Sequence, residues 1–159
     1  MKKYLIISIT GILLILIIAF SYIYKKNALP KTPPDISVVY NQDKIEAVKG
    51  FYNWFDAKEG GNSSLPDIPE NLVKNLKDES VKKGESISFS FDTTLKQPGK
   101  VTVNLVVPNL SSREKFGLSG QKCNGSSFIV PNEIGEQIFI ITAFWDETHT
   151  VDYVFKVTI

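Results

Sequence analysis

The sequence predicts a mainly β protein: an immunoglobulin-like antiparallel β-sandwich with one short helix, preceded by a single N-terminal transmembrane helix. Three observations carry this prediction. An uncharged run of 21 residues lies near the N-terminus, several later segments alternate apolar and polar residues, and no strand–helix–strand pattern interrupts them. We divide the 159 residues into a membrane anchor over 1–26, a Pro-rich linker over 27–34 and an extracytoplasmic β-sandwich domain over 35–159.

The N-terminal run, residues 4–24, contains no charged side chain. At about 1.5 Å per residue it forms a helix about 31 Å long, which matches the hydrocarbon thickness of a bilayer. An uncleaved signal-anchor is favoured, because the run is longer than a signal-peptide core and Lys25 and Lys26 follow it directly. The alternative is a signal peptide, for which Ala19-Phe20-Ser21 offers a cleavage pattern. The expected location is the cell membrane, with a single pass.

The distribution of charge bears on orientation and partners. Lysines flank the run on both sides, and the short N-terminal flank of three residues favours export of the C-terminal domain. Residues 35–159 carry 13 Lys and Arg against 17 Asp and Glu, a net charge of −4 without a basic cluster. Nucleic acid is therefore not an expected partner. The expected partners are the membrane, through the N-terminal helix, and an envelope protein or a wall polymer.

Upstream, two strands and one helix are expected. DISVVY and KIEAVKGFYNWF predict strands joined around residues 41–43, and Pro69 begins a short helix, ENLVKNL. The stretch VKGFYNWF carries rings on both faces of its strand, with Tyr52 and Trp54 on one face. Because a soluble domain avoids a large exposed apolar patch, we expect Trp54 to be mostly buried, and Gly50 to mark a bulge or a close backbone approach.

The C-terminal half predicts further strands. Alternation of apolar and polar residues indicates antiparallel strands over 81–91, 101–107, 136–145 and 151–158. The segment 136–145 is apolar on both faces and should be central. The expected core includes one side chain from each of these strands: Phe89, Leu105, Ile140 and Phe155.

Three stretches of the chain, KIEAVKGFYNW, VKKGESISFSF and GEQIFIITAFWD with the later YVFKV, resemble a group of small extracytoplasmic proteins of Gram-positive bacteria. These proteins are lipoproteins or membrane-anchored and carry a K-G-x-Y-x-W stretch, which Lys49, Gly50, Tyr52 and Trp54 match. The chain differs from that group because it lacks a lipid-bearing cysteine, and it has Asn53 where some members carry Cys. The resemblance implies location and fold but no particular activity.

The ring side chains supply the candidate binding residues, which are Tyr52, Trp54, Trp145 and His149. His149 is the only histidine and lies in a turn beside two carboxylates, where we expect it to be solvated. No G-x-S-x-G or S-x-x-K motif supplies a serine nucleophile for it. We therefore expect no catalytic residue and no enzyme activity.

No cofactor and no metal is expected. The chain has no calcium-loop motif, and its one cysteine, Cys123, lies in SGQKCNGSS without metal-ligand spacing. A half-buried side chain in a loop is the favoured interpretation of Cys123. The expected function is a module that binds or modulates an envelope or surface partner. The alternatives are a surface hydrolase acting on cell-wall material or peptide, and a structural or stress-related envelope protein without a discrete ligand.

Overall fold

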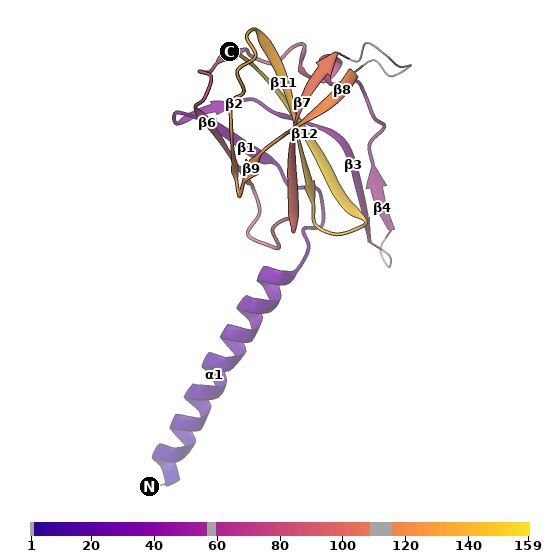
Figure 1. The fold of residues 1–159 in the computed structure, drawn as a ribbon. Coiled ribbons are helices and arrows are strands. Elements are labelled where there is room, and N and C mark those ends of the chain that lie inside the picture. Colours follow the sequence, from indigo (N-terminus) through magenta and orange to yellow (C-terminus); the bar gives the residue numbers. More distant parts are fainter. Residues whose placement is uncertain (1, 57–59, 109–115) are drawn as a thin grey trace.

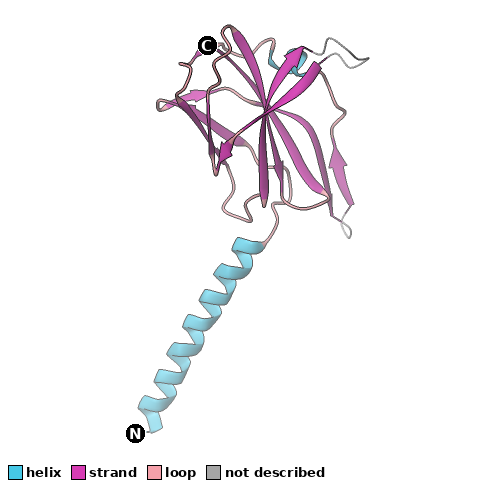
Figure 2. Cartoon of the chain, in the orientation of Figure 1, coloured by secondary structure: helices cyan, strands magenta, loops and turns pink. Residues whose placement is uncertain are grey.

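The computed structural model describes residues 2–56, 60–108 and 116–159, and on the first helix the side chains of 11–24, 26 and 27. This helix, α1 (Lys2–Asn27), projects from one end of a domain built almost entirely of strands (Figures 1 and 2). Over the part of the chain that the structure describes, no helix combines the length and apolarity needed to cross a bilayer. A membrane-spanning α1 stays a prediction.

The described residues of the domain form twelve strands and one short helix. In chain order these are β1 (Ile36–Tyr40), β2 (Asp43–Ile45), β3 (Val48–Asp56), β4 (Gly60–Ser63), α2 (Pro69–Val73), β5 (Glu79–Ser80), β6 (Ser86–Phe91), β7 (Lys100–Pro108), β8 (Phe116–Gln121), β9 (Cys123–Asn124), β10 (Ser127–Ile129), β11 (Glu136–Phe144) and β12 (His149–Thr158).

The strands make two sheets, as the sequence predicts. The first sheet has the order β2-β1-β6-β10-β9, and the second has the order β4-β3-β12-β11-β7-β8 with β5 beside β12. All described pairs are antiparallel except β5 with β12. β11 pairs with β12 on one side and with β7 on the other, so the central position predicted for 136–145 is confirmed.

The main core lies between the sheets. The ring of Phe128, from the first sheet, lies 5.1 Å from that of Phe139 in the second sheet, and Phe139 stacks on Phe155 at 5.5 Å. Phe89 and Leu105 are buried in the same core, as predicted. Contacts between aromatic rings therefore join the two sheets.

A second, smaller cluster lies on the outer face of the second sheet, beneath α2. Pro69 is the first residue of this helix, as predicted, where a missing N–H costs no hydrogen bond. Val73 packs there against Ile138, Ile140 and Val154. Ile140 is thus buried, as predicted, but under α2 and not between the sheets.

The glycine of VKGFYNWF combines both expected features. The register between β3 and β12 shifts between Val151 and Tyr153, opposite Gly50. A Cβ at Gly50 would lie 3.1 Å from Cγ2 of Val154 and 3.3 Å from Cδ1 of Leu72. The close approach of α2 and β12 explains why glycine is suited to this position.

The upstream strands differ from the prediction in one respect. β1 and β2 form the expected hairpin, with positive φ at both Asn41 (47°) and Gln42 (76°), a geometry that suits a two-residue turn. The segment KIEAVKGFYNWF, however, is divided: β2 belongs to the first sheet and β3 to the second. The chain crosses between the sheets at residues 46 and 47, a break that the apolar pattern does not reveal.

Two further predictions need correction. The strand expected over 81–91 is confirmed only for β6, because Gly84 takes φ +79° and the chain turns there before it enters the sheet. The expected loop around Cys123 instead forms β9 and a tight hairpin with β10, in which Gly125 takes φ +65°. Glycines with positive φ let the chain turn within very few residues at both places.

Candidate functional site

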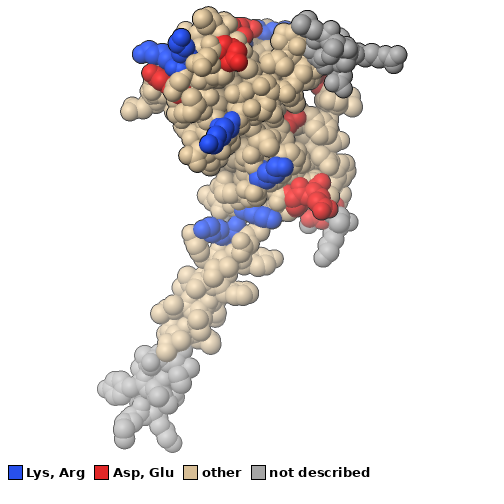
Figure 3. Space-filling view, in the orientation of Figure 1, with Lys and Arg blue, Asp and Glu red and all other residues tan. Residues whose placement is uncertain are grey.

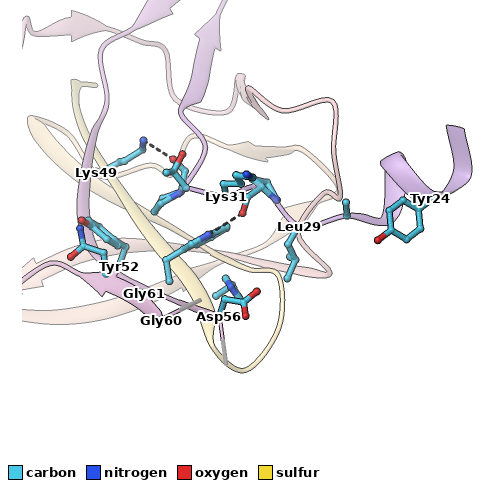
Figure 4. Close-up of a pocket in the computed structure, with 15 residues that line it drawn as sticks. Tyr24, Leu29, Lys31, Lys49, Tyr52, Asp56, Gly60 and Gly61 are labelled. Atoms are coloured by element: carbon cyan, nitrogen blue, oxygen red, sulfur yellow. Dashed lines mark hydrogen bonds between the residues drawn. The ribbon is translucent and has the colours of Figure 1, made fainter. Parts of the chain in front are cut away.

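A pocket of about 860 Å³ lies at the end of the sandwich from which α1 projects. We call it the base pocket (Figure 4). One wall comes from the last turn of α1 and the segment that follows it, and the other walls come from β3, β4 and β12. Its lining consists of Tyr24, Ala28, Leu29, Pro30, Lys31, Thr32, Pro33, Lys49, Tyr52, Trp54, Asp56, Gly60, Gly61, Asn62 and His149.

Residues 28–35, which we call the strap, hold this pocket in place. The indole Nε1 of Trp54 donates a hydrogen bond to the carbonyl of Pro30 at 3.1 Å, and the hydroxyl of Tyr153 donates to that of Pro34 at 2.7 Å. Leu29 packs against the main core. The segment expected to act as a spacer is therefore attached to the sandwich by buried hydrogen bonds.

Lys49 adds a charged contact to the strap. Its Nζ donates to the carbonyl of Pro33 at 2.8 Å and lies 2.6 Å from a carboxylate oxygen of Asp35. Lys31, in contrast, is exposed and makes no hydrogen bond or ion pair with any residue that the structure describes. Figure 3 shows basic side chains where α1 joins the domain and acidic side chains on the neighbouring edge. On its strap side the base pocket thus has an ammonium group that is not paired with any described residue.

The structure brings the four candidate binding residues together. The ring of Trp54 lies 4.8 Å from that of His149 and 5.1 Å from that of Trp145, both nearly edge-on. Trp54 is 5% exposed, Trp145 3% and His149 6%, whereas Tyr52 is half-buried in the pocket wall. The predicted burial of Trp54 is confirmed. Trp54, His149 and Tyr52 line the base pocket, and Tyr52 offers the most surface to a ligand. Trp145 is not part of the lining and supports Trp54 from the core side.

The position of His149 corrects an expectation. It was expected to be solvated in a turn, but it is the first residue of β12 and pairs with Trp54 of β3. That register directs both side chains inward, because directly opposed residues share one face of a sheet. The turn preceding it spans 145–148.

An acidic partner fixes the imidazole. Nδ1 of His149 lies 2.8 Å from Oδ1 of Asp146 and 3.1 Å from the hydroxyl of Thr148. Burial raises the pKa of Asp146, but hydrogen bonds from His149 and Thr148 outweigh it and hold that pKa below its ordinary value. The charged contact on Nδ1 leaves Nε2 as the nitrogen that a ligand could meet.

Two other sequence features lie away from the base pocket. Cys123 is half-buried as expected, with its thiol 3.3 Å from the carbonyl of Gly125, and burial raises its pKa. A raised thiol pKa disfavours the reactive thiolate. Within residues 2–56, 60–108 and 116–159, no group of three potential metal ligands comes together.

Sequence reasoning missed the strap as part of the site. The signal was present, because Pro30, Pro33 and Pro34 fix the chain in an extended form that exposes carbonyls, and Lys31 lies among them. What a single sequence does not show is which side chains bond those carbonyls, since Trp54 and Tyr153 lie 24 and 119 residues further along.

Comparison of the chain with protein-family models, with curated proteins and with solved structures finds no match.

Proposed function

We propose that the protein is a membrane-anchored, extracytoplasmic β-sandwich module, of immunoglobulin-like type, that binds or modulates a partner of the cell envelope through the base pocket, without catalysis. The resemblance to small extracytoplasmic proteins of Gram-positive bacteria belongs to the same proposal. The partner expected from the sequence is an envelope protein, a wall polymer or the membrane itself.

The character of α1 supports the anchor. Residues 11–24 include no charged side chain, and the large apolar ones among them are between 55% and 73% exposed. A helix that is apolar on all sides is stable only in apolar surroundings. The uncharged sequence extends over 4–24, which is enough residues for a bilayer.

The single observation that carries the proposal is the attachment of the strap. A flexible linker would let the domain turn freely relative to the anchor. Here the hydrogen bonds from Trp54, Tyr153 and Lys49 tie the strap to the sandwich directly after α1. The base pocket is consequently held beside the end of the proposed anchor, where an envelope partner would be met.

A surface hydrolase is the second candidate, and one observation favours it. Asp146 bonds Nδ1 of His149, and His149 lines the base pocket, which is how a general base is oriented. The described hydrogen bonds of the imidazole all use Nδ1, so a nucleophile bonded to Nε2 is not among them. Hydrolysis of wall material or peptide by the full chain, abolished by His149→Gln, would establish this candidate over the binding module.

Topology in cells tests the proposal. Protease added to intact cells should remove the domain, and the protein isolated from the membrane should begin at residue 1. A mature N-terminus at Tyr22 would show that the segment is a signal peptide. A domain protected from protease would show that it is not exported, and either result would overturn the proposal.

A further inference from the structure

We infer that the base pocket binds the phosphate-bearing headgroup of a phospholipid, with Lys31 as the group that carries the phosphate. This inference rests on the proposed function, because it requires α1 to lie in a membrane. It names the ligand class that the base pocket takes.

Depth is the first argument. The headgroup layer on each side of a bilayer is about 5–8 Å thick. Tyr24, the last residue of the uncharged run, lines the base pocket, and so does Ala28. Four residues of helix span about 6 Å, so the strap begins within the headgroup layer. Figure 4 shows the strap with Lys31 leading from the helix end that carries Tyr24 to the sandwich.

The charges of the pocket are the second argument. Lys49 is engaged by Asp35 and the Pro33 carbonyl, whereas Lys31 has no partner among the described residues. An unpaired ammonium beside a membrane attracts anionic headgroups, and lysine is a common phosphate ligand. Lys31 lines the strap side of the pocket, so the phosphate is placed on that side.

The remaining lining suits the rest of a headgroup. The half-buried ring of Tyr52 and the exposed amide of Asn62 offer one amphipathic surface and one hydrogen-bonding group. Amphipathic rings such as Tyr24 and Tyr52 are favoured at membrane interfaces. A hydroxyl-bearing, anionic headgroup such as that of phosphatidylglycerol matches this set of groups.

The test uses the full chain reconstituted in vesicles of phosphatidylcholine, with or without phosphatidylglycerol. Flotation of the vesicles measures anchoring, and native mass spectrometry of the released protein counts the lipid that it retains. We expect preferential retention of phosphatidylglycerol and a roughly tenfold loss of this preference in Lys31→Glu. Lys83→Glu is the matched control, because Lys83 is exposed and lies outside the base pocket, and it should retain the preference. Unchanged tryptophan fluorescence shows that each variant is folded, since Trp54 and Trp145 are the only tryptophans and both are buried.

The outcomes distinguish headgroup binding through Lys31 from membrane anchoring by α1. If Lys31→Glu floats and retains as much phosphatidylglycerol as the unaltered chain, the headgroup inference is wrong and the anchor stands. If the unaltered chain does not float, the anchor is wrong and the inference falls with it. Soluble glycerol phosphate tests the third possibility. If it binds the unaltered chain without vesicles and displaces the retained lipid, with Lys83→Glu behaving in the same way, the ligand is a soluble phosphate and not a lipid.

Discussion

The two faces of β3 carry similar rings but have different surroundings. On the inner face Trp54 is 5% exposed, contacts Trp145 and His149, and donates a hydrogen bond to the strap. On the outer face Phe51 and Phe55 are 39% and 42% exposed. On this outer face α2 approaches β3 near Gly50, where a Cβ would lie 3.3 Å from Cδ1 of Leu72.

The difference in burial between the two faces of β3 depends on which other parts of the chain contact the rings. The inner ring, on β3, is held by contacts from three other parts of the chain: the strap, the turn before β12 and β12 itself. The outer rings gain little burial, because α2 covers the neighbouring strands and not the end of β3. Substitutions on the two faces should therefore differ in their effect on stability.

Trp54→Ala should have the largest effect. Removing the ring deletes buried area, leaves the Pro30 carbonyl without its donor and opens a cavity beside His149. We expect a loss of about 3–5 kcal/mol in the free energy of unfolding, measured by denaturant titration of a soluble fragment that includes the strap. An unchanged midpoint would show that the inner face does not hold the domain together.

Tyr153→Phe should have an intermediate effect. Only the hydroxyl is removed, and the carbonyl of Pro34 loses a buried donor while packing is retained. The expected loss is about 1–2 kcal/mol. Tyr52→Phe is the control, because no described hydrogen bond involves the Tyr52 hydroxyl, and its stability should stay close to that of the unaltered fragment. Equal losses in both variants would show that the bond to the strap contributes nothing.

Much of the fold could be predicted from the sequence, because strand alternation and the two-sided strand β11 reflect burial directly. Phe89, Leu105 and Phe155 are buried as their period-two pattern predicts. The crossing between sheets after Ile45 was not predicted, because apolar and polar residues alternate on both sides of it. The site was predicted in part: the ring residues were identified, but their meeting with the strap depends on contacts between distant segments, which a single sequence does not contain.

Acid should destabilise the cluster of Trp54, Trp145 and His149 through Asp146. The expected loss in the free energy of unfolding is smaller than that for Tyr153→Phe. The pKa of Asp146 is lowered in the folded chain, so the stability it contributes is fully present above the ordinary value of 3.8 and is lost as pH falls below it. Because this carboxylate is partly exposed, the contribution should be below about 1 kcal/mol. Asp146→Asn should remove this part of the pH dependence in denaturation between pH 7 and about pH 3. Burial raises the pKa of Asp152, so protonation of Asp152 favours the folded state as pH falls. This contribution is the same in the unaltered protein and in Asp146→Asn, and it cancels when their pH profiles are compared. Identical pH profiles for the two proteins would contradict this role of Asp146.

Phe55→Ala should have the smallest effect, about 0.5 kcal/mol, because the ring lies on the exposed face. Denaturant titration beside Trp54→Ala compares the two faces of β3 directly. A loss for Phe55→Ala as large as that for Trp54→Ala would show that the outer face is covered by contacts that the described residues do not make.

The central claim is that the strap belongs to the sandwich and holds the base pocket beside α1. Hydrogen exchange of the two indole N–H groups, followed by NMR, tests it most directly. Both indoles donate to backbone carbonyls, Trp54 to Pro30 in the strap and Trp145 to Lys96 outside it. Lys96 also donates its own N–H to the carbonyl of Ala28 in the strap, at 3.0 Å, so Trp145 senses the strap only indirectly. Comparing residues 28–159 with residues 35–159, we predict that removing the strap accelerates exchange at Trp54 much more than at Trp145. Equally slow exchange at Trp54 in both fragments would contradict the account.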